Sequence, residues 1–218
     1  MKNSRVGVLA VLVLLAGCKA SLPPAETTAD GLVRVPSRTE GGLYRNPNAD
    51  FTRYKRLMIE PLTVEFLGGW RRQHPDVSNG EVRRIEAETA KSFLEAFTGI
   101  LVDEGPFELT EVREPDVLVV VPRMLDLNIP APETEADTGY SSSSPRSVSL
   151  QMTGELRDGV NGEVLLRAIM IIPENRYKTH KMSGSSRINN AHDIRDSLER
   201  WSRLVREAID VAKASKSH

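Results

Sequence analysis

Apolar and polar residues alternate in several stretches of this chain, and the alternation predicts half-buried strands. It runs through residues 62–66, after a short apolar run at 57–59, and through 125–129 and 148–156. The continuous apolar run at 117–121 favours a strand covered on both faces. Further short strands are expected near 32–35, 107–112 and 164–172. Because Pro61 has no N–H, the strand at 57–66 is expected to bulge there or to lie at a sheet edge.

Turn residues join two of these strands into the most clearly predicted pair. Asp158-Gly159 and Asn161-Gly162 separate the apolar stretches 148–156 and 164–172, and such dipeptides are typical of hairpin turns. The Asp158 side chain is expected to accept backbone N–H groups of this turn. The remaining segment, 36–54, is broken by Pro and Gly-Gly, so we expect irregular structure there.

Two other stretches have apolar residues at steps of three and four, which predicts amphipathic helices. The first follows Ser78 and Glu81, a capping box, and extends to about residue 102. The second covers about 193–214 and contains Trp201. The order of elements predicts an α+β fold: a single mixed or antiparallel sheet of about five or six strands with two long helices packed on one face.

The first 18 residues have a different pattern, which predicts a lipoprotein signal peptide at 1–17. Lys2 and Arg5 precede ten uncharged residues, and the small pair Ala16-Gly17 separates Leu15 from Cys18. Spanning a bilayer takes roughly 20 apolar residues, so the stretch is too short for a membrane helix. Leu15, Ala16 and Gly17 are the expected recognition residues of the signal peptidase. The Cys18 thiol is expected to carry a diacylglyceryl group, and its amine an acyl group.

The rest of the chain divides into a tether, a domain and an insertion. Residues 18–31 are rich in Pro, Ala and Thr and are predicted to form a lipidated flexible tether. A single domain is expected at 32–214, with a disordered insertion rich in Pro, Glu, Thr and Ser at 130–147. Two or three acyl chains hold a protein on a bilayer durably.

Composition excludes several partners and cofactors. A net charge of −1 gives no reason to expect nucleic acid. Cys18 is the only cysteine, so an acylated chain has no thiol left for a disulfide, a metal or a nucleophile. The four histidines are His74, His180, His192 and His218. They lack the i, i+4 spacing of a zinc site, so we expect no metal and no cofactor besides the lipid groups.

One loop holds the only candidate binding surface outside the anchor. Trp70, Arg71, Arg72 and His74 could bind an anionic group there, or the Trp could simply cover the core beside solvated arginines. No serine has the surroundings of a nucleophile elbow. A hydrolase acting on cell-wall material through Glu60 or Asp116 with His74 is the alternative hypothesis.

Several motifs resemble a family of proteobacterial lipoproteins that contain a domain of unknown function. They are the lipobox, Ile59-Glu60-Pro61-Leu62-Thr63-Val64, Gly154-Glu155-Leu156-Arg157-Asp158 and the terminal helix around Trp201. The layout is also similar to small α/β domains of periplasmic lipoproteins that assemble secretion pores or activate cell-wall synthases.

These resemblances imply a place in the cell envelope. In enterobacterial lipoproteins an Asp after the cysteine retains the protein at the inner membrane. Lys19 here implies an outer-membrane anchor with the domain in the periplasm. We therefore expect a non-enzymatic binding or assembly module, with the lipid bilayer and an envelope protein complex as partners. Its expected contact surfaces are the strand containing Pro61 and the 130–147 insertion.

Overall fold

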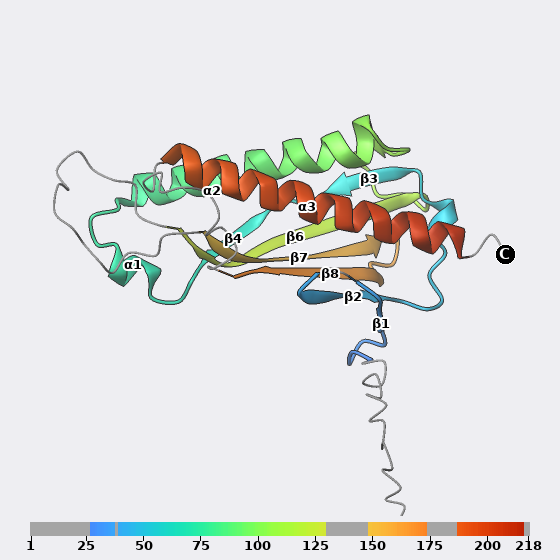
Figure 1. Ribbon diagram of the computed structural model, residues 1–218. Coiled ribbons are helices and arrows are strands. Elements are labelled where there is room, and N and C mark those ends of the chain that lie inside the picture. Colours follow the sequence, from blue (N-terminus) through green and yellow to red (C-terminus); the bar gives the residue numbers. More distant parts are fainter. Residues whose placement is uncertain (1–26, 38, 130–147, 174–186, 216–218) are drawn as a thin grey trace, which may run out of the picture.

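A computed structural model describes residues 27–37, 39–129, 148–173 and 187–215. These residues form one mixed sheet of eight strands in the order β1-β2-β8-β7-β6-β3-β5, with β4 pairing to β6 beyond the end of β3 (Figure 1). The strands are β1 (Val33–Val35), β2 (Gly41–Arg45), β3 (Arg56–Ile59), β4 (Thr63–Phe66), β5 (Glu108–Leu109), β6 (Val117–Asn128), β7 (Ser149–Asp158) and β8 (Val164–Ile172). The predicted insertion at 130–147 lies outside the described residues.

The predicted sheet of five or six strands is wrong, because the structure is richer in sheet. The segment expected to be irregular contains β2, which pairs along its whole length with β8. In the sequence, Gly41 and Gly42 indicate a break in the chain, yet both lie inside this strand at φ of 118° and 134°. A Cβ on Gly41 would lie 2.6 Å from the Ile169 carbonyl oxygen, so glycine is what allows β2 to approach β8.

The stretch 57–66 also counts as two strands rather than one. Ile59 pairs with Val120, and Thr63 pairs with Arg123. Between these two pairs, the segment that joins β3 to β4 has one residue more than β6. Pro61 lies in the interruption between β3 and β4, whereas the register shift within β4 lies between Val64 and Phe66. Both β3 and β4 run parallel to β6, which makes the sheet mixed.

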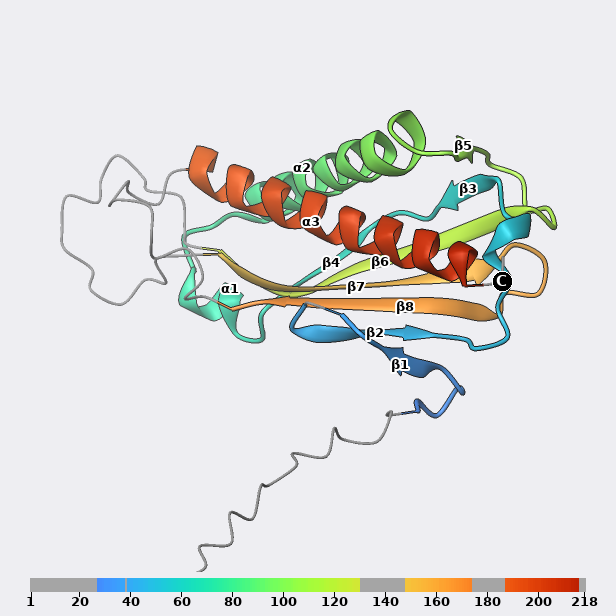
Figure 2. The same cartoon turned by 45° about the vertical axis from the view of Figure 1, so that its right-hand side comes forward.

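The helical part consists of a short α1 (Trp70–Gln73), one long helix α2 (Asn79–Thr98) and the C-terminal helix α3 (Arg187–Ala214). A 3₁₀ turn, η1, covers Phe51–Arg53, and α2 continues into a π-helical turn, η2, at Gly99–Asp103. The predicted start of α2 is confirmed, since Ser78 Oγ accepts the Glu81 N–H at 3.1 Å. Figure 2 shows α2 and α3 side by side over one face of the sheet.

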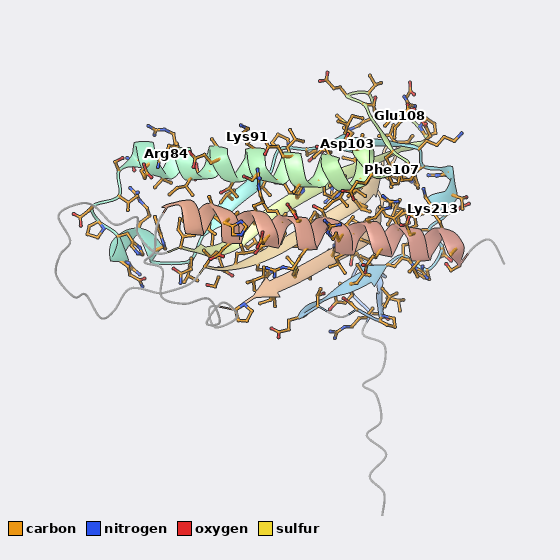
Figure 3. All side chains as sticks on the ribbon, turned by 45° about the horizontal axis from the view of Figure 1, so that its top comes forward. Arg84, Lys91, Asp103, Phe107, Glu108 and Lys213 are labelled. Carbon is orange, nitrogen blue, oxygen red and sulfur yellow. The ribbon has the colours of Figure 1, made fainter. Side chains whose placement is uncertain are left out.

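The core lies between these helices and the sheet, and Trp201 is its centre. The Trp201 side chain is fully buried, with the rings of Phe93 and Phe97 at 5.9 and 5.7 Å between centroids. A Cβ on Gly154 of β7 would lie 2.5 Å from the indole, so only glycine lets the ring lie against this strand. At the end of α3, Lys213 Nζ lies 4.5 Å from the Phe107 ring centroid, and burial lowers the Lys213 pKa (Figure 3).

The predicted hairpin between β7 and β8 is confirmed. Leu156 pairs with Leu166, and Asp158 Oδ1 accepts the backbone N–H groups of Val160 and Asn161. The second carboxylate oxygen of Asp158 accepts the Tyr54 hydroxyl at 2.7 Å. Burial, together with this bond, raises the pKa of Tyr54 to about 12.

Candidate functional site

The predicted anchor residues Leu15, Ala16, Gly17 and Cys18 lie outside the described residues, and the described chain begins at Thr27. Residues 27–32, called the tether root below, fold against β1. Thr27 bridges to Val33, and the Thr28 N–H donates to the Leu32 carbonyl at 2.9 Å. The Leu32 side chain is only 1% exposed. The last residues of the predicted tether thus belong to the folded body.

An ion-pair network joins the tether root to the middle of the sheet. Asp30 accepts from Arg167 of β8 at 2.7 Å, and Arg167 also donates to Glu155 of β7 at 2.6 Å. The Arg167 hydrogen bond lowers the pKa of Asp30 to about 2. Glu155 follows Gly154, which faces Trp201, so the network lies on the sheet face opposite the helices.

Sequence reasoning missed this network because Asp30 comes from a segment far from the β7–β8 hairpin that holds Glu155 and Arg167. Asp30 and Arg167 are 137 residues apart. The one local signal is Asp30-Gly31, a turn dipeptide, and Gly31 adopts φ of 81°. That signal could have predicted a turn at this position, but not its partner.

At the other end of the sheet, β5 borders β3 and β4 borders β6 directly. Among the described strands, β4 pairs with β6 alone. The Leu67 N–H donates to the Leu127 carbonyl of β6 at 3.0 Å. Because backbone groups alternate in direction along a strand, the N–H and C=O groups of Val64 and Phe66 then point away from β6. These outward groups define what we call the β4 edge. Of the predicted strand at 57–66, the part after Pro61, β4, lies at a sheet edge, whereas β3 lies between β6 and β5.

Side chains along the β4 edge form one apolar and one polar row. Val64 and Phe66 are partly buried and pack against the core. Thr63 and Glu65 are exposed, and Glu65 pairs with Arg123 at 2.7 Å with both side chains about half exposed. Leu67, just beyond the strand, is 36% exposed. An extended peptide that paired here would continue both rows.

The loop predicted as a binding surface is largely turned inward. Trp70 is 1% exposed, and its Nε1–H donates to the Ile129 carbonyl at 2.9 Å. His74 is 8% exposed and stacks on Trp70 with 4.5 Å between ring centroids. Arg71 donates back to the Val77 carbonyl at 2.9 Å, and Arg72 is exposed. The interpretation in which Trp70 covers the core fits this geometry, whereas a binding surface would need Trp70 and His74 to be accessible.

The structure does not bring together the residues of the hydrolase hypothesis. Asp116 precedes β6 and pairs with Arg56, while His74 stacks on the tryptophan that contacts Ile129 after β6. The 12 residues of β6 between these points span about 40 Å. Glu60 donates its N–H to Val120 near the start of the same strand, and its carboxylate pairs with Arg113 at 2.8 Å. These acids cannot share a cleft with His74, since paired glycosidase carboxylates lie within about 10 Å.

The other candidate chemistry adds little. His180 and His218 lie outside the described residues, and His192 Nδ1 lies 3.7 Å from Asp196. In the described part of the chain, no group of three or more His, Cys, Asp or Glu side chains could hold a metal ion. None of the described helices combines the length and the apolar character needed to cross a membrane.

Comparison with protein families and with curated proteins found no match. Solved structures that align with the chain include two crystal forms of the PelC dodecamer from Paraburkholderia phytofirmans, one of them a variant. They are 11% and 12% identical to it, cover 74% and 73% of this chain and 98% and 97% of PelC, and have TM-scores of 0.34 and 0.33. A neuraminyllactose-binding hemagglutinin homolog from Helicobacter pylori is 10% identical, with 78% and 92% covered and a TM-score of 0.32. Likeness at this level carries no argument about function.

Proposed function

We propose that this chain is a bacterial lipoprotein anchored to the outer membrane through Cys18, with a body that acts as a non-enzymatic binding or assembly module in the periplasm. The observation that carries the proposal is Leu15-Ala16-Gly17-Cys18 at the end of a ten-residue uncharged stretch. A diacylglyceryl group and an N-acyl chain on Cys18 would hold the chain on a bilayer durably. The resemblance to proteobacterial lipoproteins with a domain of unknown function is part of this proposal.

The β4 edge supports the second half of the proposal. Its outward N–H and C=O groups are where an extended peptide could add a strand, with main-chain hydrogen bonds giving affinity and side-chain rows giving specificity. β4 has four residues, Thr63–Phe66, and Pro61, which has no N–H, lies just before them. The separation of His74 from Glu60 and Asp116 removes the specific catalytic grouping that the alternative needed.

The anchor is tested by expressing the chain and its Cys18→Ser variant in a Gram-negative host with radiolabelled palmitate. We expect the parent to be labelled and to sediment with the outer membrane. The variant should be unlabelled and should retain residues 1–17. A matched Lys19→Asp variant should stay labelled but move to the inner membrane of an enterobacterial host. An unlabelled, soluble parent chain would contradict the anchor.

The binding role is tested by cross-linked pull-down from envelope extracts. Val64→Pro removes an N–H that points away from β6, so it blocks strand addition while leaving the β6 hydrogen bonds in place. Val160→Ala, at a side chain that is 68% exposed elsewhere on the body, is the matched control. We expect the parent and Val160→Ala to recover the same envelope partner and Val64→Pro to lose it. Recovery of no partner by the parent would count against a binding module.

A further inference from the structure

The tether root shortens the predicted flexible link between anchor and body. Because the root is folded, only the nine residue steps from Cys18 to Thr27 separate the acylated residue from the described body. Nine fully extended residues reach at most about 30 Å, and a flexible chain of that length averages about 17 Å between its ends. The point where the chain enters the body is therefore held close to the bilayer surface.

The point where the chain enters the body, at Thr27, and the β4 edge lie at opposite edges of the sheet. The tether root packs on β1, and β1, β2, β8, β7, β6 and β4 follow one another across the sheet (Figure 2). Five inter-strand spacings of about 4.8 Å separate β1 from β4 by roughly 24 Å. Because the chain enters the body at the β1 edge, the β4 edge is on average the farther of the two from the membrane.

Asp30 keeps the entry point at this edge. Its pair with Arg167 ties the root to β8, and Leu32 is buried beside β1. Thr27, where the described body begins, bridges to Val33 of β1, so residues 19–26 join the body at this edge.

We infer that the body is held with its β1 edge toward the bilayer and its β4 edge toward the periplasmic space, where it takes an extended segment of a periplasmic protein. This inference rests on the proposed anchor at Cys18. The segment that fits the edge alternates in character, with apolar side chains on the side of Phe66 and polar side chains on the side of Glu65. An integral membrane protein would have to reach past the whole sheet to pair there.

The orientation is tested with the lipidated protein in vesicles of phosphatidylethanolamine and phosphatidylglycerol. Cys18 is the only cysteine and is acylated, so Ala29→Cys and Thr63→Cys each supply one free thiol for a donor dye. Both positions are exposed, Ala29 in the tether root and Thr63 at the β4 edge. With an acceptor dye on the lipid headgroups, energy transfer should be at least twofold more efficient from position 29 than from position 63. Equal transfer, or stronger transfer from 63, would overturn the orientation.

Two controls separate this inference from the anchor itself. If the parent protein fails to float with the vesicles, the proposed anchor fails; if it floats but the two positions transfer equally, only the orientation fails. Insertion of twenty Gly-Ser residues between Cys18 and Thr27 should bring the two transfer efficiencies together, because the longer link no longer holds the β1 edge near the lipid.

The occupant is tested in intact cells by a photo-cross-linking residue at position 63, with position 29 as the matched control. A conjugate at 63 but not at 29, mapped to an extended, alternating segment of a periplasmic protein, is the expected result. A conjugate of twice the chain's own mass, a conjugate with an integral membrane protein, or an internal link to residues 130–147 would each overturn the assigned occupant.

Discussion

The two edges of this sheet are built differently, although they belong to the same eight strands. At the β1 edge the chain returns on itself, buries Leu32 and pairs Asp30 with Arg167. At the β4 edge it does not return, and the outward groups of Val64 and Phe66 have no strand beside them among the described residues. Unpaired edges invite other chains. In the proposed function, the β1 edge serves attachment and the β4 edge recognition.

The largest expected effect on the free energy of unfolding comes from a substitution at the β1 edge. Leu32→Ala removes a side chain that is 1% exposed, and it should lower the free energy of unfolding by about 2–4 kcal/mol. Leu67→Ala, next to the β4 edge, is the matched control and should cost less than about 1 kcal/mol because Leu67 is already 36% exposed. Urea unfolding of the chain from residue 19 onward measures both. Equal costs would remove the contrast between the edges.

Amide hydrogen exchange compares the edges without mutation. The N–H groups of Val64 and Phe66 point away from β6, whereas β8 is paired on both sides, so Ala168 and Met170 are protected whichever way they point. We expect the two β4 amides to exchange about 100-fold faster or more, because they need no opening of the sheet. Exchange as slow at Val64 as at Ala168 would show that another segment covers this edge.

A smaller, pH-dependent effect is expected for Asp30→Asn. The folded-state pKa of Asp30 is about 2, below its ordinary 3.8, so the carboxylate stabilises the fold above pH 3.8 and loses this contribution as the pH falls through 2. The stability difference between the parent and Asp30→Asn should therefore be constant above about pH 5 and should shrink toward pH 2. Since this pair is exposed, the effect should stay well below that of Leu32→Ala. A difference that does not change between pH 5 and pH 2 contradicts the network.

The smallest effect on the free energy of unfolding is expected at the β4 edge. Glu65 and Arg123 are both about half exposed, so Glu65→Gln should change the free energy of unfolding by no more than about 0.5 kcal/mol. Urea titrations at low and high salt, run in parallel with Asp30→Asn, provide the measurement. A larger loss for Glu65→Gln than for Asp30→Asn at pH 7 would reverse the comparison.

Local signals predicted the parts of the fold that are determined locally. Ser78 predicted the start of α2, and Asp158-Gly159 predicted the β7–β8 turn. Pro61 predicted the interruption that precedes the edge strand β4. Each of these residues acts on a backbone group only a few positions away, or lacks such a group itself. The sequence therefore indicated correctly where these elements begin, turn or break.

Features that depend on distant contacts could not be predicted in this way. Gly41 looks like a chain breaker until the Ile169 carbonyl is known to lie against it, so β2 and the true strand count were missed. For Trp70 and His74 the sequence left two interpretations open, an anion-binding surface or a tryptophan that covers the core, and only their packing near Ile129 shows that both are buried. The Asp30–Arg167 pair likewise became visible only when the sheet had assembled.

The most direct test of the whole account is the intact mass of the protein isolated from bacterial membranes. The account predicts a chain that begins at Cys18 and carries a diacylglyceryl group and an N-acyl chain. A chain that retains residues 1–17 and has an unmodified thiol at Cys18 would contradict the anchor and the orientation inferred from it.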